Sequence, residues 1–77
     1  MLDHENAMKL WEKLLGDATE ACDKKGRLIY KEAYGQHGSN SGWDIHHIIP
    51  KSQGGTDDFD NMEIIHVITH DEIHKKH

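Results

Sequence analysis

A histidine-rich segment carries the residue types that could do chemistry in this chain. From Trp43 to His74 the sequence reads WDIHHIIPKSQGGTDDFDNMEIIHVITHDEIH. It holds the adjacent pair His46 and His47, then Asn61, and finally two histidines four positions apart. Imidazoles bind transition metals and exchange protons near neutral pH, so histidines in this order indicate a metal site beside a proton acceptor.

The composition sets limits on what such a site can serve. With 77 residues the chain is near the size at which a hydrophobic core alone becomes marginal and a bound metal adds stability. Nine Lys and Arg stand against 14 Asp and Glu, a formal charge of -5, which is the wrong sign for a broad basic surface that binds nucleic acid. The lone Cys22 excludes an internal disulfide and a four-thiolate zinc site. Because the charge does not favour a broad basic surface, any phosphate partner must be held by a few local contacts.

Neither membrane insertion nor secretion is indicated by the sequence. No apolar stretch approaches the roughly 20 residues that a membrane span requires. The start, MLDHENAMKLWEKLL, is acidic and amphipathic, unlike a secretory signal with a basic and then an apolar region. We therefore expect no membrane partner and a cytoplasmic location.

Two elements are predicted upstream of the histidine-rich segment, over residues 3–31. Apolar residues at helical spacing predict a helix of about three turns that follows Asp3 as N-cap and ends at Gly16. A glycine-containing turn over residues 23–27, with apolar residues on both sides, predicts a short hairpin.

The segment itself is predicted to form a strand, a loop, a second strand and a helix. The first strand covers residues 43–49 and is ended by Pro50, which has no amide hydrogen for a strand ladder. A polar loop over residues 52–60 leads to a second strand near residues 62–65. A capping box then starts the last helix, formed by Thr69 and Glu72.

On that helix, His70 and His74 project from one face, about one turn apart, and can bind the same ion. By contrast, His46 and His47 are neighbours on a strand and point to opposite faces, so their roles must divide between metal ligand and proton acceptor. His66 is expected to pack or to face a substrate rather than to bind metal.

The segment from Trp43 to His74 resembles the HNH endonuclease family of the ββα-metal nucleases. The resemblance rests on WDIHHIIPKSQGG, then Asn61-Met62, then His70, and the upstream turn and Gly42-Trp43 are similar to small single-domain members. It implies an α+β fold in a single domain of residues 1–77. In that domain an N-terminal helix and a short hairpin precede a ββα-metal core at about residues 43–77. The implied activity is hydrolysis of phosphodiester bonds in DNA.

The resemblance also implies a role for each matching position. His46 occupies the first metal-ligand position, which is Asp in many small members, and His47 matches the general base that activates water. Asn61 matches the residue that ties the loop to the backbone and so orients the base. His70 matches the second metal ligand, and His74 is similar to an additional ligand of colicin-type members.

The implied cofactor is a divalent metal ion, namely Zn, Ni, Mn or Mg. Two or three imidazoles favour a transition metal, whereas Mg²⁺ prefers oxygen ligands. Hydrolysis of a phosphodiester needs a deprotonated water and a cation that neutralises charge as the bond breaks. One base and one metal are sufficient for this chemistry.

The implied partner is nucleic acid, expected to be double-stranded DNA, in a phage or bacterial setting. Candidate phosphate contacts are Lys51, Lys75 and Lys76. With so few basic residues, a homodimer or a partner protein could be required to hold a duplex. The alternative is a non-catalytic module whose ion is structural and whose surface binds nucleic acid or protein. The acidic balance favours this alternative slightly, and the combination of His47 with Asn61 favours the endonuclease more strongly.

The remaining histidines and the tryptophans have simpler interpretations. No spacing argues for a function of His4, His37 or His77, which are expected to be solvated. Trp11 and Trp43 are expected in the core, because a domain this small needs large apolar side chains to bury.

Overall fold

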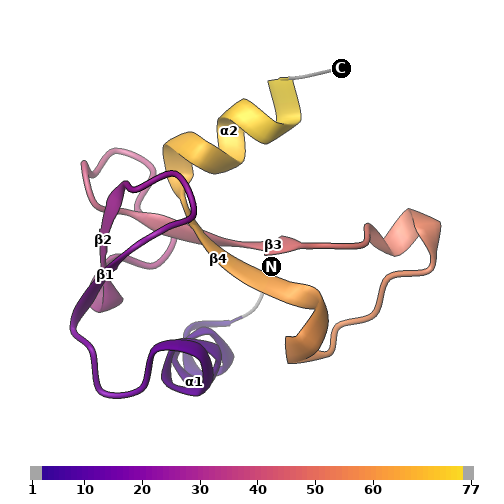
Figure 1. Ribbon diagram of the computed structural model, residues 1–77, viewed down its shortest axis with the longest axis horizontal. Helices are drawn as coiled ribbons and strands as arrows, with labels where there is room; N and C mark the ends of the chain where they lie inside the picture. The colour runs from indigo at the N-terminus through magenta and orange to yellow at the C-terminus, as the bar shows by residue number, and fades with distance from the viewer. Residues whose placement is uncertain (1–2, 76–77) are drawn as a thin grey trace.

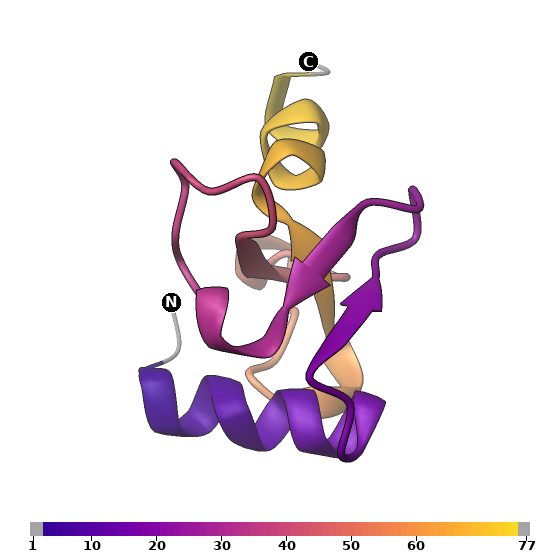
Figure 2. The ribbon, with the colours of Figure 1, turned by 90° about the vertical axis from the view of Figure 1, so that its left-hand side faces the viewer.

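The computed structural model describes residues 3–75 and has an α+β fold, as predicted. Two antiparallel two-stranded sheets, β1–β2 and β3–β4, lie between two helices at opposite ends of the molecule (Figures 1 and 2). Neither helix of the described part is long and apolar enough to cross a membrane. The elements are α1 (His4–Leu15), β1 (Glu20–Cys22), β2 (Leu28–Tyr30), β3 (Trp43–His47), β4 (Met62–His66) and α2 (Val67–Lys75).

The first helix begins and ends where the sequence predicts. The side chain of Asp3 accepts a hydrogen bond from the backbone N–H of Asn6 at 2.9 Å, which satisfies one of the free donors at the helix start. At the other end Gly16 has a φ of 63°, and its N–H donates to the carbonyl of Glu12. A glycine suits this position because a positive φ is strained for residues with a Cβ atom.

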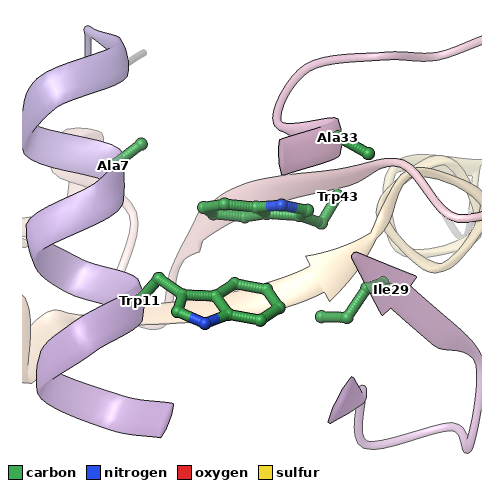
Figure 3. Packing of buried hydrophobic residues seen from close by; sticks show 5 residues of the cluster. All are labelled: Ala7, Trp11, Ile29, Ala33 and Trp43. Carbon is green, nitrogen blue, oxygen red and sulfur yellow. The ribbon is translucent and has the colours of Figure 1, made fainter. Parts of the chain in front are cut away.

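The core is built around two tilted indole rings, those of Trp11 and Trp43, whose centroids are 5.1 Å apart (Figure 3). Each indole N–H donates to a backbone carbonyl, from Trp11 to Ala18 at 2.7 Å and from Trp43 to Lys31 at 3.1 Å. The two indole N–H groups are thus satisfied, and the prediction that both tryptophans lie in the core is confirmed. The buried side chains around them are Ala7, Ile29 and Ala33.

The predicted strand over residues 43–49 is two residues shorter in the structure. Pairing between β3 and β4 stops at His47, which lies opposite Met62. Beyond that pair, Ile48 donates its backbone N–H to the carbonyl of Asn61, and Ile49 donates to the side chain of Asn61. Ile49 thus bonds a side chain rather than a facing strand, and the loop that follows projects beyond β3 (Figure 1).

The predicted cap of the last helix was wrong. Helix α2 begins at Val67, three residues before His70, where a helix capped by Thr69 would begin. The imidazole of His66 occupies the capping position instead, because its Nδ1 accepts the backbone N–H of Ile68 at 3.0 Å. Thr69 is fully buried in the first turn, and Glu72 lies one turn further along.

The buried hydroxyl of Thr69 donates a hydrogen bond to Oδ2 of Asp23, a carboxylate in a residue that is only 8% exposed. The same oxygen accepts the backbone N–H of His66 at 3.0 Å. Oδ1 of Asp23 accepts the backbone N–H groups of Lys25 and Arg27, at 2.9 and 3.0 Å. The hairpin turn is thereby bonded to the junction between β4 and α2. Arg27 adds a hydrogen bond to Thr69 Oγ1 and two to the carboxylate of Glu72.

Burial raises the pKa of Asp23, but the hydrogen bonds from Thr69 and from three backbone N–H groups outweigh it and leave the pKa below its ordinary value of 3.8. A folded-state pKa below the unfolded value means that the ionised carboxylate stabilises the fold above about pH 3.8. This contribution is lost as the pH falls through the folded-state pKa.

Replacement of Asp23 by Asn is expected to lower the free energy of unfolding by about 2–3 kcal/mol at pH 7, because the amide offers one acceptor oxygen in place of two. Urea unfolding, followed by circular dichroism, measures this difference. It should shrink below about pH 4, where the wild-type carboxylate gains a proton. Asp17→Asn, at an exposed position, is the matched control. An equal effect of both substitutions would contradict the role of Asp23.

Candidate active site

Helix α2 and strand β3 bring the three predicted metal ligands close to one another. The ring centroids of His46 and His70 are 5.9 Å apart, those of His46 and His74 6.3 Å, and those of His70 and His74 4.6 Å. The Nε2 atoms of His70 and His74 approach to 2.9 Å. These rings line a cleft of about 490 Å³, together with His37, Asp44, Ile45, His47, Pro50 and Asp71.

The chemistry of these donors suits a divalent transition metal. With metal–nitrogen bonds of about 2.0–2.1 Å, two imidazoles on one tetrahedral ion have ring centroids about 5 Å apart. The three observed separations lie on both sides of that value. Within residues 3–75, no group of three or more His, Cys, Asp or Glu side chains is arranged to hold a metal ion. Binding an ion would therefore require the rings of His46, His70 and His74 to rotate toward a common centre.

Two of the predicted ligands have a carboxylate within hydrogen-bond distance of their Nδ1 atom. His46 Nδ1 is 3.0 Å from Glu63 Oε1, and His70 Nδ1 is 3.1 Å from Asp44 Oδ2. An Nδ1–H that donates to a carboxylate leaves the Nε2 lone pair for a metal, and such partners fix the orientation of metal-binding histidines. Burial raises the pKa of Glu63, but hydrogen bonds from Lys24 and His46 outweigh it and leave the pKa lowered.

Neither carboxylate was predicted as a site residue from the sequence. Asp44 and His46 are two apart on a strand and so share a face, a signal that could have identified Asp44. Glu63 lies directly opposite His46 in the β3–β4 register, and that register is not known before the strands are paired.

Asp44 also brings an unexpected histidine to the cleft. Its side chain is nearly buried, and Oδ2 lies 3.2 Å from Nε2 of His37, which was expected to be solvated. The His37 side chain is 56% exposed, yet it forms part of the cleft wall beside the predicted ligands. Within residues 3–75, the second oxygen of Asp44 has no hydrogen-bond partner.

The ring of His47, the predicted base, is held by a side chain. Its Nε2 lies 3.0 Å from Oδ1 of Asp57, whose other oxygen accepts a hydrogen bond from Lys51 Nζ at 2.9 Å. Hydrogen bonds from Lys51 and His47 lower the pKa of Asp57, so its carboxylate is ionised and acts only as an acceptor. A neutral His47 must therefore carry its proton on Nε2, which leaves the Nδ1 lone pair to accept a proton.

Asn61 closes the loop that carries Asp57. Its Nδ2 donates to the carbonyls of Ile49 at 3.0 Å and Thr56 at 2.9 Å, and its Oδ1 accepts the N–H of Ile49. One side chain, near the end of the loop, is thus bonded to the start of the loop and to its middle. Gly55 permits this close approach, because a Cβ atom there would lie 1.7 Å from the Ile49 carbonyl oxygen.

The other predicted site residues lie farther from these contacts. Lys51 is exposed and paired with Asp57, and Lys75 is exposed at the end of α2. Lys76 lies outside the described residues. His66 is buried, and both its ring nitrogens are engaged, Nε2 with the carbonyl of Asn40 at 2.7 Å and Nδ1 at the start of α2. It therefore packs within the fold.

A model of the HNH endonuclease family matches residues 20–76, a range that includes the hairpin, both strands of the second sheet and all of α2. The chain belongs to the HNH endonuclease family. HNH domains are in general nucleases, and membership supports a nuclease-type activity on nucleic acid. No curated protein sequence and no solved structure matches the chain.

Addition of Zn²⁺ or Ni²⁺ to the metal-free HNH domain is expected to raise its melting temperature. Binding to the folded state adds about 2.7 kcal/mol of stability when free metal is 100 times the Kd. A thermal-shift titration measures the effect, and a chelator should reverse it. His70→Ala should remove most of the shift, whereas His4→Ala, at the exposed start of α1, should retain it. Equal metal-dependent shifts in both variants would exclude His70 as a ligand.

Proposed function

We propose that this HNH protein is a metal-dependent endonuclease that hydrolyses phosphodiester bonds in DNA. In this proposal His47 is the general base, and His46, His70 and His74 hold the divalent ion. The observation that carries it is the combination, in one cleft, of three converging imidazoles with a fourth whose Nε2 contacts an ionised carboxylate.

Each residue has a distinct task in the proposed reaction. A bound divalent ion would supply neutralisation of the charge that develops on the phosphate and on the leaving oxygen. His47 accepts a proton from water at Nδ1, because its Nε2–H is committed to a carboxylate. Glu63 and Asp44 keep the Nε2 atoms of their histidine partners available as metal ligands. The imidazole donors favour Zn²⁺, Ni²⁺ or Mn²⁺ over Mg²⁺.

Binding of double-stranded DNA needs positive charge near the cleft. The phosphate contacts we propose are Lys51, Lys75 and Lys76, and Lys51 is already near the base through their shared partner, Asp57. The formal charge of -5 opposes a long duplex contact, so a homodimer or a partner protein would supply the additional cationic surface.

The same charge favours a second candidate function, a non-catalytic module that binds nucleic acid or protein and uses the metal for stability. In that case the imidazoles would serve the fold alone. The two candidates differ in what His47 does, because His47 is not among the proposed ligands.

His47→Ala is expected to lower the rate of supercoiled-plasmid nicking about 10²- to 10⁴-fold with Mn²⁺, Ni²⁺, Zn²⁺ or Mg²⁺ added, because the general base is lost. Gel electrophoresis of the nicked circle gives the rate. His4→Ala should nick at the wild-type rate, and His47→Ala should keep its metal-dependent thermal shift. If wild type and His47→Ala behave alike with every metal while both remain folded, the protein is not this endonuclease.

A further inference from the structure

The carboxylate of Asp57 is fixed on both oxygens although its side chain is 60% exposed. Oδ1 lies 3.0 Å from Nε2 of His47, and Oδ2 lies 2.9 Å from Nζ of Lys51. An isolated exposed ion pair contributes little to stability, since water competes for both charges. This arrangement is therefore better explained by its effect on the imidazole than by its effect on the fold.

The backbone beside Asp57 is held as firmly as its side chain. Asn61 donates one hydrogen bond to the carbonyl of Thr56, the residue before Asp57, and another to the carbonyl of Ile49. Ile49 lies two positions after His47 on the same segment. One amide thus links the stretch that carries the carboxylate to the stretch that carries the imidazole.

We propose that Asp57 is a positioning residue that holds the His47 ring with Nε2–H toward the carboxylate and Nδ1 toward the cleft. The proposal deepens the proposed function and rests on it for the catalytic consequence. Asn61 then acts on the base through the loop it closes, by keeping Asp57 within hydrogen-bond distance of the ring. Removal of the carboxylate frees the ring to turn and to exchange its two neutral tautomers.

A competing role for Asp57 is that of a phosphate mimic. A carboxylate that accepts hydrogen bonds from His47 and Lys51 could occupy the position of a substrate phosphate, and would then have to leave when DNA binds. The bond from Asn61 to Thr56 argues against that movement, because it fixes the backbone directly before Asp57. The two roles predict opposite effects of Asp57→Ala on nicking.

Asp57→Ala is expected to lower kcat for nicking about 10- to 100-fold with little change in KM, as is typical when a group that orients an active-site histidine is lost. Asp58→Ala is the matched control, since it removes one negative charge from the next position, whose side chain does not cap the following turn. Lys51→Ala should instead raise KM, because it removes a proposed phosphate contact. A higher rate for Asp57→Ala, or a kcat equal to that of Asp58→Ala, overturns the proposal.

Long-range ¹H–¹⁵N spectra of protein labelled at histidine test the positioning role without any nuclease assay. At about pH 9, where imidazoles are neutral, the wild-type His47 signals, assigned by their loss in His47→Ala, should show the Nε2–H tautomer. Asp57→Ala should shift them toward a mixture of tautomers, and Asp58→Ala should not. Unchanged His47 signals in Asp57→Ala overturn the proposal even if nicking is observed. Changed signals support it even if no variant nicks DNA, in which case only the proposed function fails.

Discussion

The buried carboxylate of Asp23 is the interaction on which the rest of the structure depends. It accepts hydrogen bonds from the hairpin turn, from the end of β4 at His66 and from Thr69 in the first turn of α2. His70 follows Thr69 directly in the chain, so the position of one proposed ligand is fixed by a hairpin that contributes no ligand. This dependence agrees with the start of the family match at residue 20, where the hairpin begins.

Contacts between imidazoles and carboxylates recur in the cleft. Glu63 contacts His46, Asp44 contacts His70, and Asp57 contacts His47, the proposed general base. Part of the acidic excess therefore serves to orient histidines rather than to cover the surface. This reduces the weight of the charge of -5 as an argument against a nucleic-acid substrate, because some of that charge is paired at the site.

The sequence predicted the elements well where one residue controls a local structure. Asp3 and Gly16 marked the ends of α1, and the glycine-containing turn marked the hairpin. The start of α2 was missed because the hydroxyl of Thr69 has a partner 46 positions away, which removes it from local capping. The convergence of the histidines was expected from a family resemblance, since no local rule brings residues on β3 and α2 together.

The supporting carboxylates were missed for a related reason. The contact of Glu63 with His46 depends on strand register, and the contact of Asp57 with His47 depends on how a loop folds back. Both contacts depend on tertiary structure, so no fixed spacing between the residues predicts them from the sequence. Asn61 was predicted to tie this loop to the backbone, and its hydrogen bonds to Ile49 have that geometry.

The proposed site requires that imidazoles from two elements, β3 and α2, share one divalent ion. Crystals grown with Zn²⁺ and measured on both sides of the zinc absorption edge test it most directly. We expect one anomalous peak within about 2.0–2.1 Å of the Nε2 atoms of His46, His70 and His74. A fully occupied zinc peak elsewhere on the protein, with these three rings still separated, would contradict it.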